Sequence, residues 1–129
     1  MMTENDISKA ILDAAFKVHT VLGPGLLEAA YEKALKFELE RRGLSAPRQV
    51  TVPIRYEELV IDEGFIADLI VNDQVIVELK SVEQIHPVHK KQLLTYLKLT
   101  GKRLGLLLNF NTPILRDGIT RIVNGLPDT

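Results

Sequence analysis

Two carboxylates and an amine interrupt a stretch of sequence that otherwise predicts buried strands. The stretch GFIADLIVNDQVIVELKS covers residues 64–81 and contains Asp68, Glu78 and Lys80 among aliphatic side chains. Carboxylate oxygens are the ligands that Mg²⁺ prefers, usually one or two of them together with water and substrate phosphate. An ammonium two residues beyond Glu78 can reach a phosphate or a water held by the metal. These residue types therefore allow metal-assisted chemistry on a phosphate.

The register of the predicted hairpin decides whether these side chains meet. A two-residue turn would place Asp68 and Glu78 on opposite faces of the sheet, because cross-strand partners share a face. A three-residue turn over 72–74 sorts the side chains better and is the register we expect. It gives an apolar face that pairs Val71 with Val75, Leu69 with Val77 and Ala67 with Leu79, and a second face that pairs Ile70 with Ile76, Asp68 with Glu78 and Ile66 with Lys80.

Opposed residues in this register have Cβ atoms roughly 4.5–5.5 Å apart. Two carboxylates that close repel each other and would hold a proton between them, and a divalent cation removes the conflict. The alternative is an incidental cluster on a solvated face, with Lys80 as a salt-bridge partner, since E-x-K is a common tripeptide.

The elements that must position these residues follow the order α-α-β-β-β-α-β-β. Apolar residues at helical or alternating spacing, with Gly and Pro between the runs, set the boundaries. Pro53 cannot donate to a ladder, so its strand is expected at a sheet edge or in a bulge. Helices are expected over about 5–22, 26–42 and 87–100, and strands over about 49–56, 64–71, 75–80, 103–110 and 119–123.

Composition narrows the class of protein. The chain has 129 residues, 46% of them hydrophobic and 26% charged, which predicts a single globular domain over 1–129. The absence of cysteine excludes disulfides and thiolate metal sites. The net charge of −1 gives no bulk attraction to nucleic acid, so any such binding must use local patches. No signal peptide or membrane span is apparent, and a cytoplasmic location is expected.

Four short motifs occur in order along the chain: GLLEAAY at 25–31, GFIAD at 64–68, ELK at 78–80 and QLLTY at 92–96. Asp68 together with the ELK run resembles the D-x(n)-E-x-K signature of PD-(D/E)XK nucleases. GFIAD and QLLTY are similar to the G-h-x-x-D and Q-h-x-x-Y motifs of the RecB-type branch. GLLEAAY carries the signature of the small GxxExxY family, which is usually placed in the same superfamily. The resemblance covers about residues 6–125.

The resemblance implies a three-layer α/β/α restriction-endonuclease-like core with a central mixed β-sheet. It also implies a metal-dependent nuclease that acts on DNA. By this resemblance Mg²⁺ or Mn²⁺ is held by Glu28, Asp68, Glu78 and the backbone carbonyl of Leu79. Lys80 positions the attacking water or stabilises the transition state, and Gln92 and Tyr96 support the site. Without the resemblance, Glu28 reads as an exposed helix residue and Tyr31 as a packing residue with a hydrogen-bonded hydroxyl.

Several alternatives stay open at this point. A non-catalytic nucleic-acid-binding module could keep the same fold and acidic pocket, and a regulatory subunit could act through an oligomer such as a homodimer. His86 and His89 lack zinc-site spacing and are expected on the surface. With Lys90 and Lys91 they form a basic cluster at a helix start, which suits a phosphate contact, although a solvated charge run is commoner.

Overall fold

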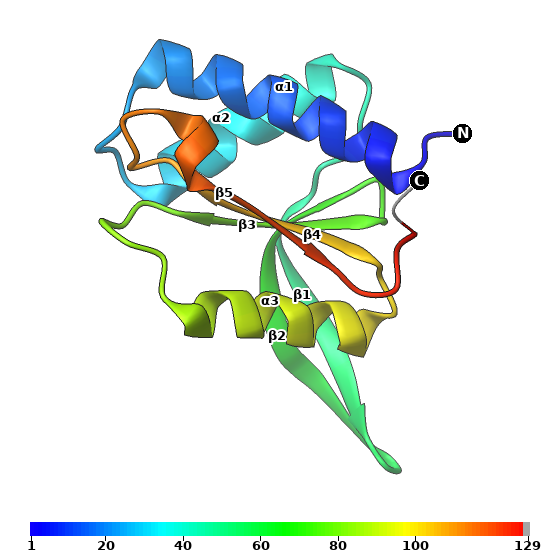
Figure 1. Ribbon diagram of the computed structural model, residues 1–129. Coiled ribbons are helices and arrows are strands. Elements are labelled where there is room, and N and C mark those ends of the chain that lie inside the picture. The colour runs from blue at the N-terminus through cyan, green and yellow to red at the C-terminus, as the bar shows by residue number, and fades with distance from the viewer. Residues whose placement is uncertain (128–129) are drawn as a thin grey trace.

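A five-stranded mixed sheet lies between two helical layers in the computed structural model, which describes residues 1–127 (Figure 1). Helices α1 (Glu4–Leu22) and α2 (Glu28–Arg41) cover one face, and α3 (Pro87–Thr100) covers the other. The strands are β1 (Arg48–Tyr56), β2 (Leu59–Val71), β3 (Val75–Lys80), β4 (Leu104–Asn109) and β5 (Ile119–Val123), with a 3₁₀ turn η1 (Leu115–Gly118) before β5. The predicted element order and three-layer α/β/α class are confirmed.

The strand order in the sheet is β1-β2-β3-β4-β5. Only β3 and β4 run parallel, and α3 is the crossover that connects them. β1 is an edge strand, and its register with β2 shifts between Val52 and Ile54. Pro53 lies at that shift, as expected for a residue without a backbone N–H. Within residues 1–127 no helix is both long and apolar enough to cross a bilayer.

Each face of the sheet carries its own apolar cluster. Under α1 and α2 the cluster includes Val75, Val77 and Leu79 of β3. Under α3 it includes Ile76 of β3, so side chains of β3 alternate between the two layers. Glu78 follows this alternation and points to the α3 side. A carboxylate has therefore been placed in a strand that is covered by helices on both faces.

The β2–β3 hairpin has the predicted register near its turn and departs from it at the charged residues. The pairs Leu69↔Val77, Ile70↔Ile76 and Val71↔Val75 are all present. The predicted pairs of Asp68 with Glu78, Ala67 with Leu79 and Ile66 with Lys80 are absent from the ladder, which ends at Leu69↔Val77. β2 continues against β1 alone, with Ala67↔Val50 and Ile66↔Thr51, while β3 continues against β4, with Leu79↔Leu108 and Lys80↔Asn109.

β2 also begins earlier than the expected residue 64. It starts at Leu59 and forms with β1 a hairpin arm, residues 53–64, that projects from the domain (Figure 1). The sequence before residue 64 shows no apolar/polar alternation, because Leu59, Val60 and Ile61 are consecutive and are followed by two acidic residues, and all of these side chains are exposed. Gly64 allows the close approach of the two strands of the arm. A Cβ at this position would lie 2.5 Å from a carbon of the Ile54 side chain.

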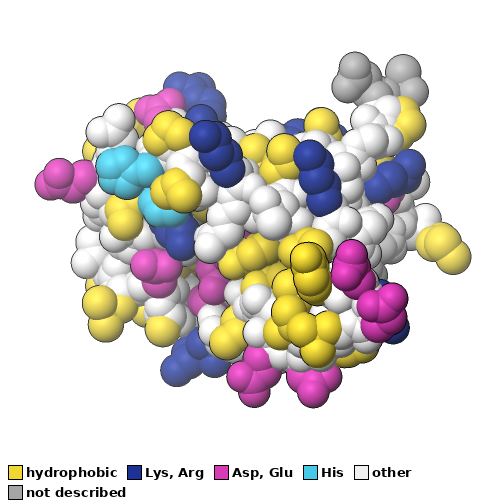
Figure 2. All heavy atoms as spheres, turned by 90° about the horizontal axis from the view of Figure 1, so that it is seen from below, with side chains coloured by type: hydrophobic (Ala, Val, Ile, Leu, Met, Phe, Trp, Pro, Cys, Tyr) yellow, Lys and Arg dark blue, Asp and Glu magenta, His cyan; other side chains and the backbone are white. Residues whose placement is uncertain are grey.

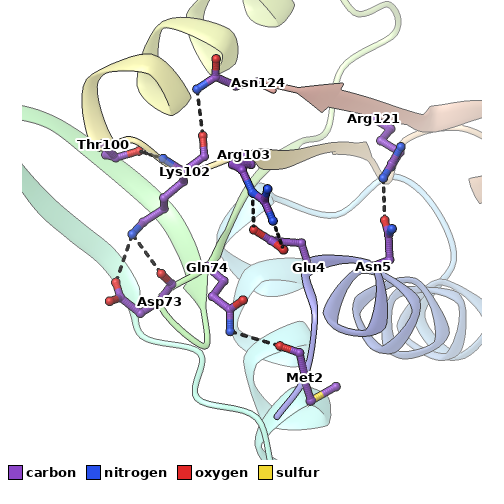
Figure 3. Close-up of polar contacts among 10 residues, drawn as sticks. All are labelled: Met2, Glu4, Asn5, Asp73, Gln74, Thr100, Lys102, Arg103, Arg121 and Asn124. Carbon is purple, nitrogen blue, oxygen red and sulfur yellow. Dashed lines mark hydrogen bonds and ion pairs between the residues drawn. The ribbon is translucent and has the colours of Figure 1, made fainter. Parts of the chain in front are cut away.

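Ion pairs anchor the turn of the β2–β3 hairpin to the start of β4 (Figure 3). Lys102 Nζ donates to the backbone oxygen of Asp73 at 3.0 Å and to its carboxylate at 3.1 Å. Next to it, Arg103 makes a two-bond contact with Glu4, at 2.9 and 3.0 Å, and so ties in the first turn of α1. The turn end of the hairpin is fixed, and the opposite end is where β2 and β3 separate.

Candidate active site

Asp68 and Glu78 interlock at the point where β2 leaves β3. The backbone N–H of Asp68 donates to Glu78 Oε2 at 2.8 Å. In return, the backbone N–H of Leu79 donates to Asp68 Oδ2 at 2.9 Å. Each carboxylate therefore takes a backbone donor of the other strand that a regular ladder would have used. This exchange keeps Asp68 and Glu78 next to each other, although the β2–β3 ladder does not continue through them.

Glu78 is nearly inaccessible to solvent, with 6% of its surface exposed. Burial raises the pKa of its carboxyl from the ordinary 4.5 to about 8, and the negative charge of Asp68 acts in the same direction. The charge of Glu32 adds to the rise, while the Asp68 N–H and the Lys80 ammonium oppose it. In the metal-free protein this carboxyl is consequently protonated at pH 7.

The backbone on both sides of Lys80 is held by neighbouring elements. Lys80 pairs with Asn109 of β4, and its carbonyl accepts from the N–H of Phe110 at 2.9 Å. The next residue, Ser81, donates its hydroxyl to the carbonyl of Leu26 at 2.6 Å, in the loop before α2. The end of β3 is thereby joined to the start of α2.

The Lys80 side chain is half-buried, and its charge acts on Glu78 and on His89. Its positive charge lowers the pKa of Glu78 and also contributes to the lowered pKa of His89, for which burial is the first cause. Among residues 1–127 Lys80 forms no ion pair. Its ammonium is thus available to an anion such as a phosphate.

Sequence reasoning missed Glu32, the buried carboxylate of α2. Only 3% of Glu32 is exposed, whereas Glu28 is the exposed first residue of that helix. Glu32 Oε1 lies 3.0 Å from Arg48 Nε of β1, but the buried Nε–H is not aligned for a hydrogen bond. A signal was present in the sequence. Glu32 falls in the apolar stripe of α2, three residues before Leu35, much as Glu78 interrupts an apolar strand.

The two tyrosines have different roles in the structure. Tyr31 is a packing residue: its hydroxyl donates to the carbonyl of Gly23 at 2.6 Å and accepts from the N–H of Leu26 at 3.0 Å. Tyr96 stacks on Phe65 with ring centroids 3.8 Å apart. Burial raises the pKa of Tyr96, and the negative charges of Glu78 and Asp68 raise it further.

Gln92 lies one turn before Tyr96 on α3, with an exposed side chain. The basic residues at the start of α3 lie on the surface as expected. Their local structure includes a hydrogen bond of 3.2 Å from the His86 N–H to His89 Nδ1, which caps the helix. On the side of the molecule seen in Figure 2, basic and acidic side chains both appear, and hydrophobic side chains gather between them. This face is therefore mixed in charge rather than a continuous basic surface.

The donor set fits a hard cation in its chemistry. Asp68 and Glu78 provide two adjacent carboxylates, the number that Mg²⁺ commonly takes from a protein, and the backbone carbonyl of Leu79 is a further oxygen donor. The predicted trio with Glu28 is not assembled, since no three His, Asp or Glu side chains in the described part of the chain converge as metal ligands. The carboxylates of Asp68 and Glu78 are engaged with backbone N–H groups instead.

A family model described as the PD-(D/E)XK nuclease superfamily matches residues 5–122. The matched span contains the whole sheet except the last residue of β5, and every residue discussed above as part of the site. Searches of curated proteins and of solved structures found no match.

Proposed function

Because the chain belongs to the PD-(D/E)XK nuclease superfamily, we propose that it is a metal-dependent nuclease that hydrolyses phosphodiester bonds in DNA. The observation that carries the proposal is the close set of Asp68, Glu78 and Lys80. Two carboxylates, one of them forced to be neutral by burial, lie beside an ammonium that forms no ion pair within residues 1–127. A purely structural cluster gains nothing from a buried carboxyl that must keep its proton.

Mg²⁺ or Mn²⁺ would be held by Asp68, Glu78 and the backbone carbonyl of Leu79. When bound, the cation activates a water and offsets charge on the phosphate. Glu28, as the resemblance implies, and the buried Glu32 are the two carboxylates of α2 from which a third ligand would come. Recruiting either requires movement of side chains, because neither joins the pair in this structure.

Lys80 would donate to the phosphate oxygens, where negative charge grows as the bond breaks, or hold the attacking water in line. Gln92 and Tyr96, on the same face of α3, would orient Lys80, water or phosphate. The basic cluster of His86, His89, Lys90 and Lys91 would contact the nucleic-acid backbone. Assignment to the GxxExxY branch, formation of a homodimer and a cytoplasmic location stay predictions from the sequence.

A non-catalytic nucleic-acid-binding module is the second candidate. It is favoured by the net charge of −1 and by the mixed charge of the face in Figure 2, which offers little grip on a long duplex. The test is incubation with labelled single-stranded, duplex and branched DNA and with RNA, in Mg²⁺, in Mn²⁺ and in chelator. Cleavage that stops in chelator supports the nuclease. Binding without cleavage under every metal favours the module.

Metal linkage gives a test that does not depend on finding the substrate. Adding Mn²⁺ at about 100 times its Kd should stabilise the wild-type protein by about 2.7 kcal/mol. For a chain of this length that is a rise in Tm of roughly 10 °C. Asp68→Asn should lose most of this response, because a neutral amide is a poorer ligand for a hard cation than a carboxylate. The response of each variant is measured from its own metal-free Tm.

The matched control is Asp62→Asn, the same change at an exposed site in the arm, which should respond to Mn²⁺ like the wild type. The measurement is thermal melting across millimolar Mn²⁺ and Mg²⁺. A wild-type Tm that stays the same in both metals would identify Asp68 and Glu78 as an incidental acidic pair.

A further inference from the structure

The side-chain amide of Gln49 bridges two carboxylates from different layers. Its Nε2 donates to both oxygens of Glu32 on α2, at 2.9 and 3.1 Å, and to Asp68 Oδ1 on β2 at 3.2 Å. Only a donor is tolerated between two carboxylates, because the amide oxygen would be repelled by both. The amide nitrogen of Gln49 is therefore fixed in place by its two partners.

The backbone of Gln49 adopts an unusual conformation to reach this position. Its φ is +52°, in the left-handed region that side chains other than glycine seldom occupy. The other non-glycine residues with positive φ in residues 1–127 lie at hairpin turns, at Glu57, Asn72 and Asp73. Gln49 lies inside β1, between residues that pair regularly with β2. Strained residues of this kind persist where the surrounding structure fixes them, commonly at functional sites.

The strained residue lies beside the point where the side chains of β2 change from one face of the sheet to the other. On β2, Ala67 packs in the cluster under α3, whereas Leu69 packs in the cluster under α1 and α2. Regular alternation would place both on one face. The break falls at Asp68, which lies opposite Gln49, since Arg48 pairs with Leu69 and Val50 with Ala67. The local backbone thus brings the Gln49 amide between Asp68 and Glu32 of α2.

We propose that Gln49 is a positioning residue that orients the Asp68 carboxylate and sets its separation from Glu32. The inference rests on the proposed function, in which Asp68 is a metal ligand. Asp68 is held at both oxygens, Oδ1 by Gln49 and Oδ2 by the Leu79 N–H, so its carboxylate plane is fixed before any cation arrives. Partners that orient a metal ligand in this way typically change metal affinity by about 10–100-fold when they are removed.

Two substitutions separate the amide from the strained backbone. Gln49→Gly removes the amide and relieves the positive φ, whereas Gln49→Met removes the amide and keeps the strain and most of the side-chain volume. The Gln49 side chain is exposed, so neither change opens the core. Both variants should need at least about tenfold more Mn²⁺ for half-maximal thermal stabilisation.

The matched control is Glu57→Gly, at the same backbone conformation (φ +53°) in the turn of the arm and away from the site. It should bind Mn²⁺ as the wild type does. An unchanged Mn²⁺ midpoint in both Gln49 variants overturns the positioning role even if the wild-type protein cleaves DNA. A higher Mn²⁺ midpoint in Gln49→Gly but not in Gln49→Met also overturns the positioning role, because the backbone and not the amide would then be responsible. A wild-type Tm that does not change with Mn²⁺ overturns the proposed metal site and this inference with it.

Discussion

Lys80→Ala is expected to slow single-turnover cleavage of DNA by about 10²–10³-fold, the usual loss when a positioned donor is removed from a developing negative charge. The wild-type ammonium is close enough to Glu78 to lower the pKa of that carboxyl, and its backbone is fixed by β4 and by the loop before α2. Because it acts on the transition state, its loss should reduce turnover more than binding. The assay uses saturating metal, since loss of the Lys80 charge also lets Glu78 keep its proton more firmly.

Two further variants sharpen the Lys80 test. Lys80→Arg should also be slow, because a planar guanidinium does not present a compact ammonium at the same point. Lys9→Ala is the control: this lysine lies on α1, in the opposite layer from α3, and its ammonium pairs only with Asp13 at 3.1 Å within residues 1–127. Its cleavage rate should match that of the wild type.

DNA binding by Lys80→Ala, measured at fixed salt because phosphate contacts are salt-sensitive, should persist through Lys90 and Lys91. Equal cleavage rates for wild type and Lys80→Ala would rule out the assigned role of the ammonium. A parallel loss of binding and cleavage would make Lys80 a binding contact and remove it from the chemical step.

Glu78→Gln is expected to abolish a large pH dependence of stability in the metal-free protein. The folded-state pKa of Glu78, about 8, lies above the unfolded value of 4.5, so the folded protein holds a proton that the unfolded chain releases in this window. The free energy of unfolding should therefore fall as pH rises from about 4.5 to about 8. Each pH unit corresponds to about 1.4 kcal/mol, which gives a total of at most about 5 kcal/mol.

Glutamine is the neutral analogue and can still accept the Asp68 N–H, so Glu78→Gln should lack this slope. The measurement is denaturant unfolding of both proteins in chelator, from about pH 5 to about pH 9, with the difference between them isolating Glu78 from other titrating groups. Glu58→Gln, an exposed site in the arm, should follow the wild type. Parallel curves for wild type and Glu78→Gln would show that Glu78 is not held neutral, and the electrostatic basis of the site would fall.

Local patterns were enough to predict most of the scaffold. The apolar stripe of α1, the Pro87 start and Gly101 end of α3, and the buried run of β4 depend on residues close in sequence, and each is present in the structure. The register at the turn of the β2–β3 hairpin followed from sorting apolar from charged side chains, because a slip of one residue would expose the whole apolar set. The D-x(n)-E-x-K pattern indicated the superfamily because its three residues lie close in sequence, on the two adjoining strands β2 and β3.

Only the tertiary structure decided how the acidic residues are arranged. The separation of β2 from β3 at Asp68 arises because two carboxylates accept backbone N–H groups across the strands, a competition that strand periodicity does not register. The choice between Glu28 and Glu32 depends on the rotation of α2 against the sheet, which buries one and exposes the other. Gln49 belongs to the site because its backbone is left-handed and because its amide contacts Glu32 and Asp68, which are 17 and 19 residues away in sequence. Contacts that are distant in sequence, together with a strained backbone, leave no local pattern to read.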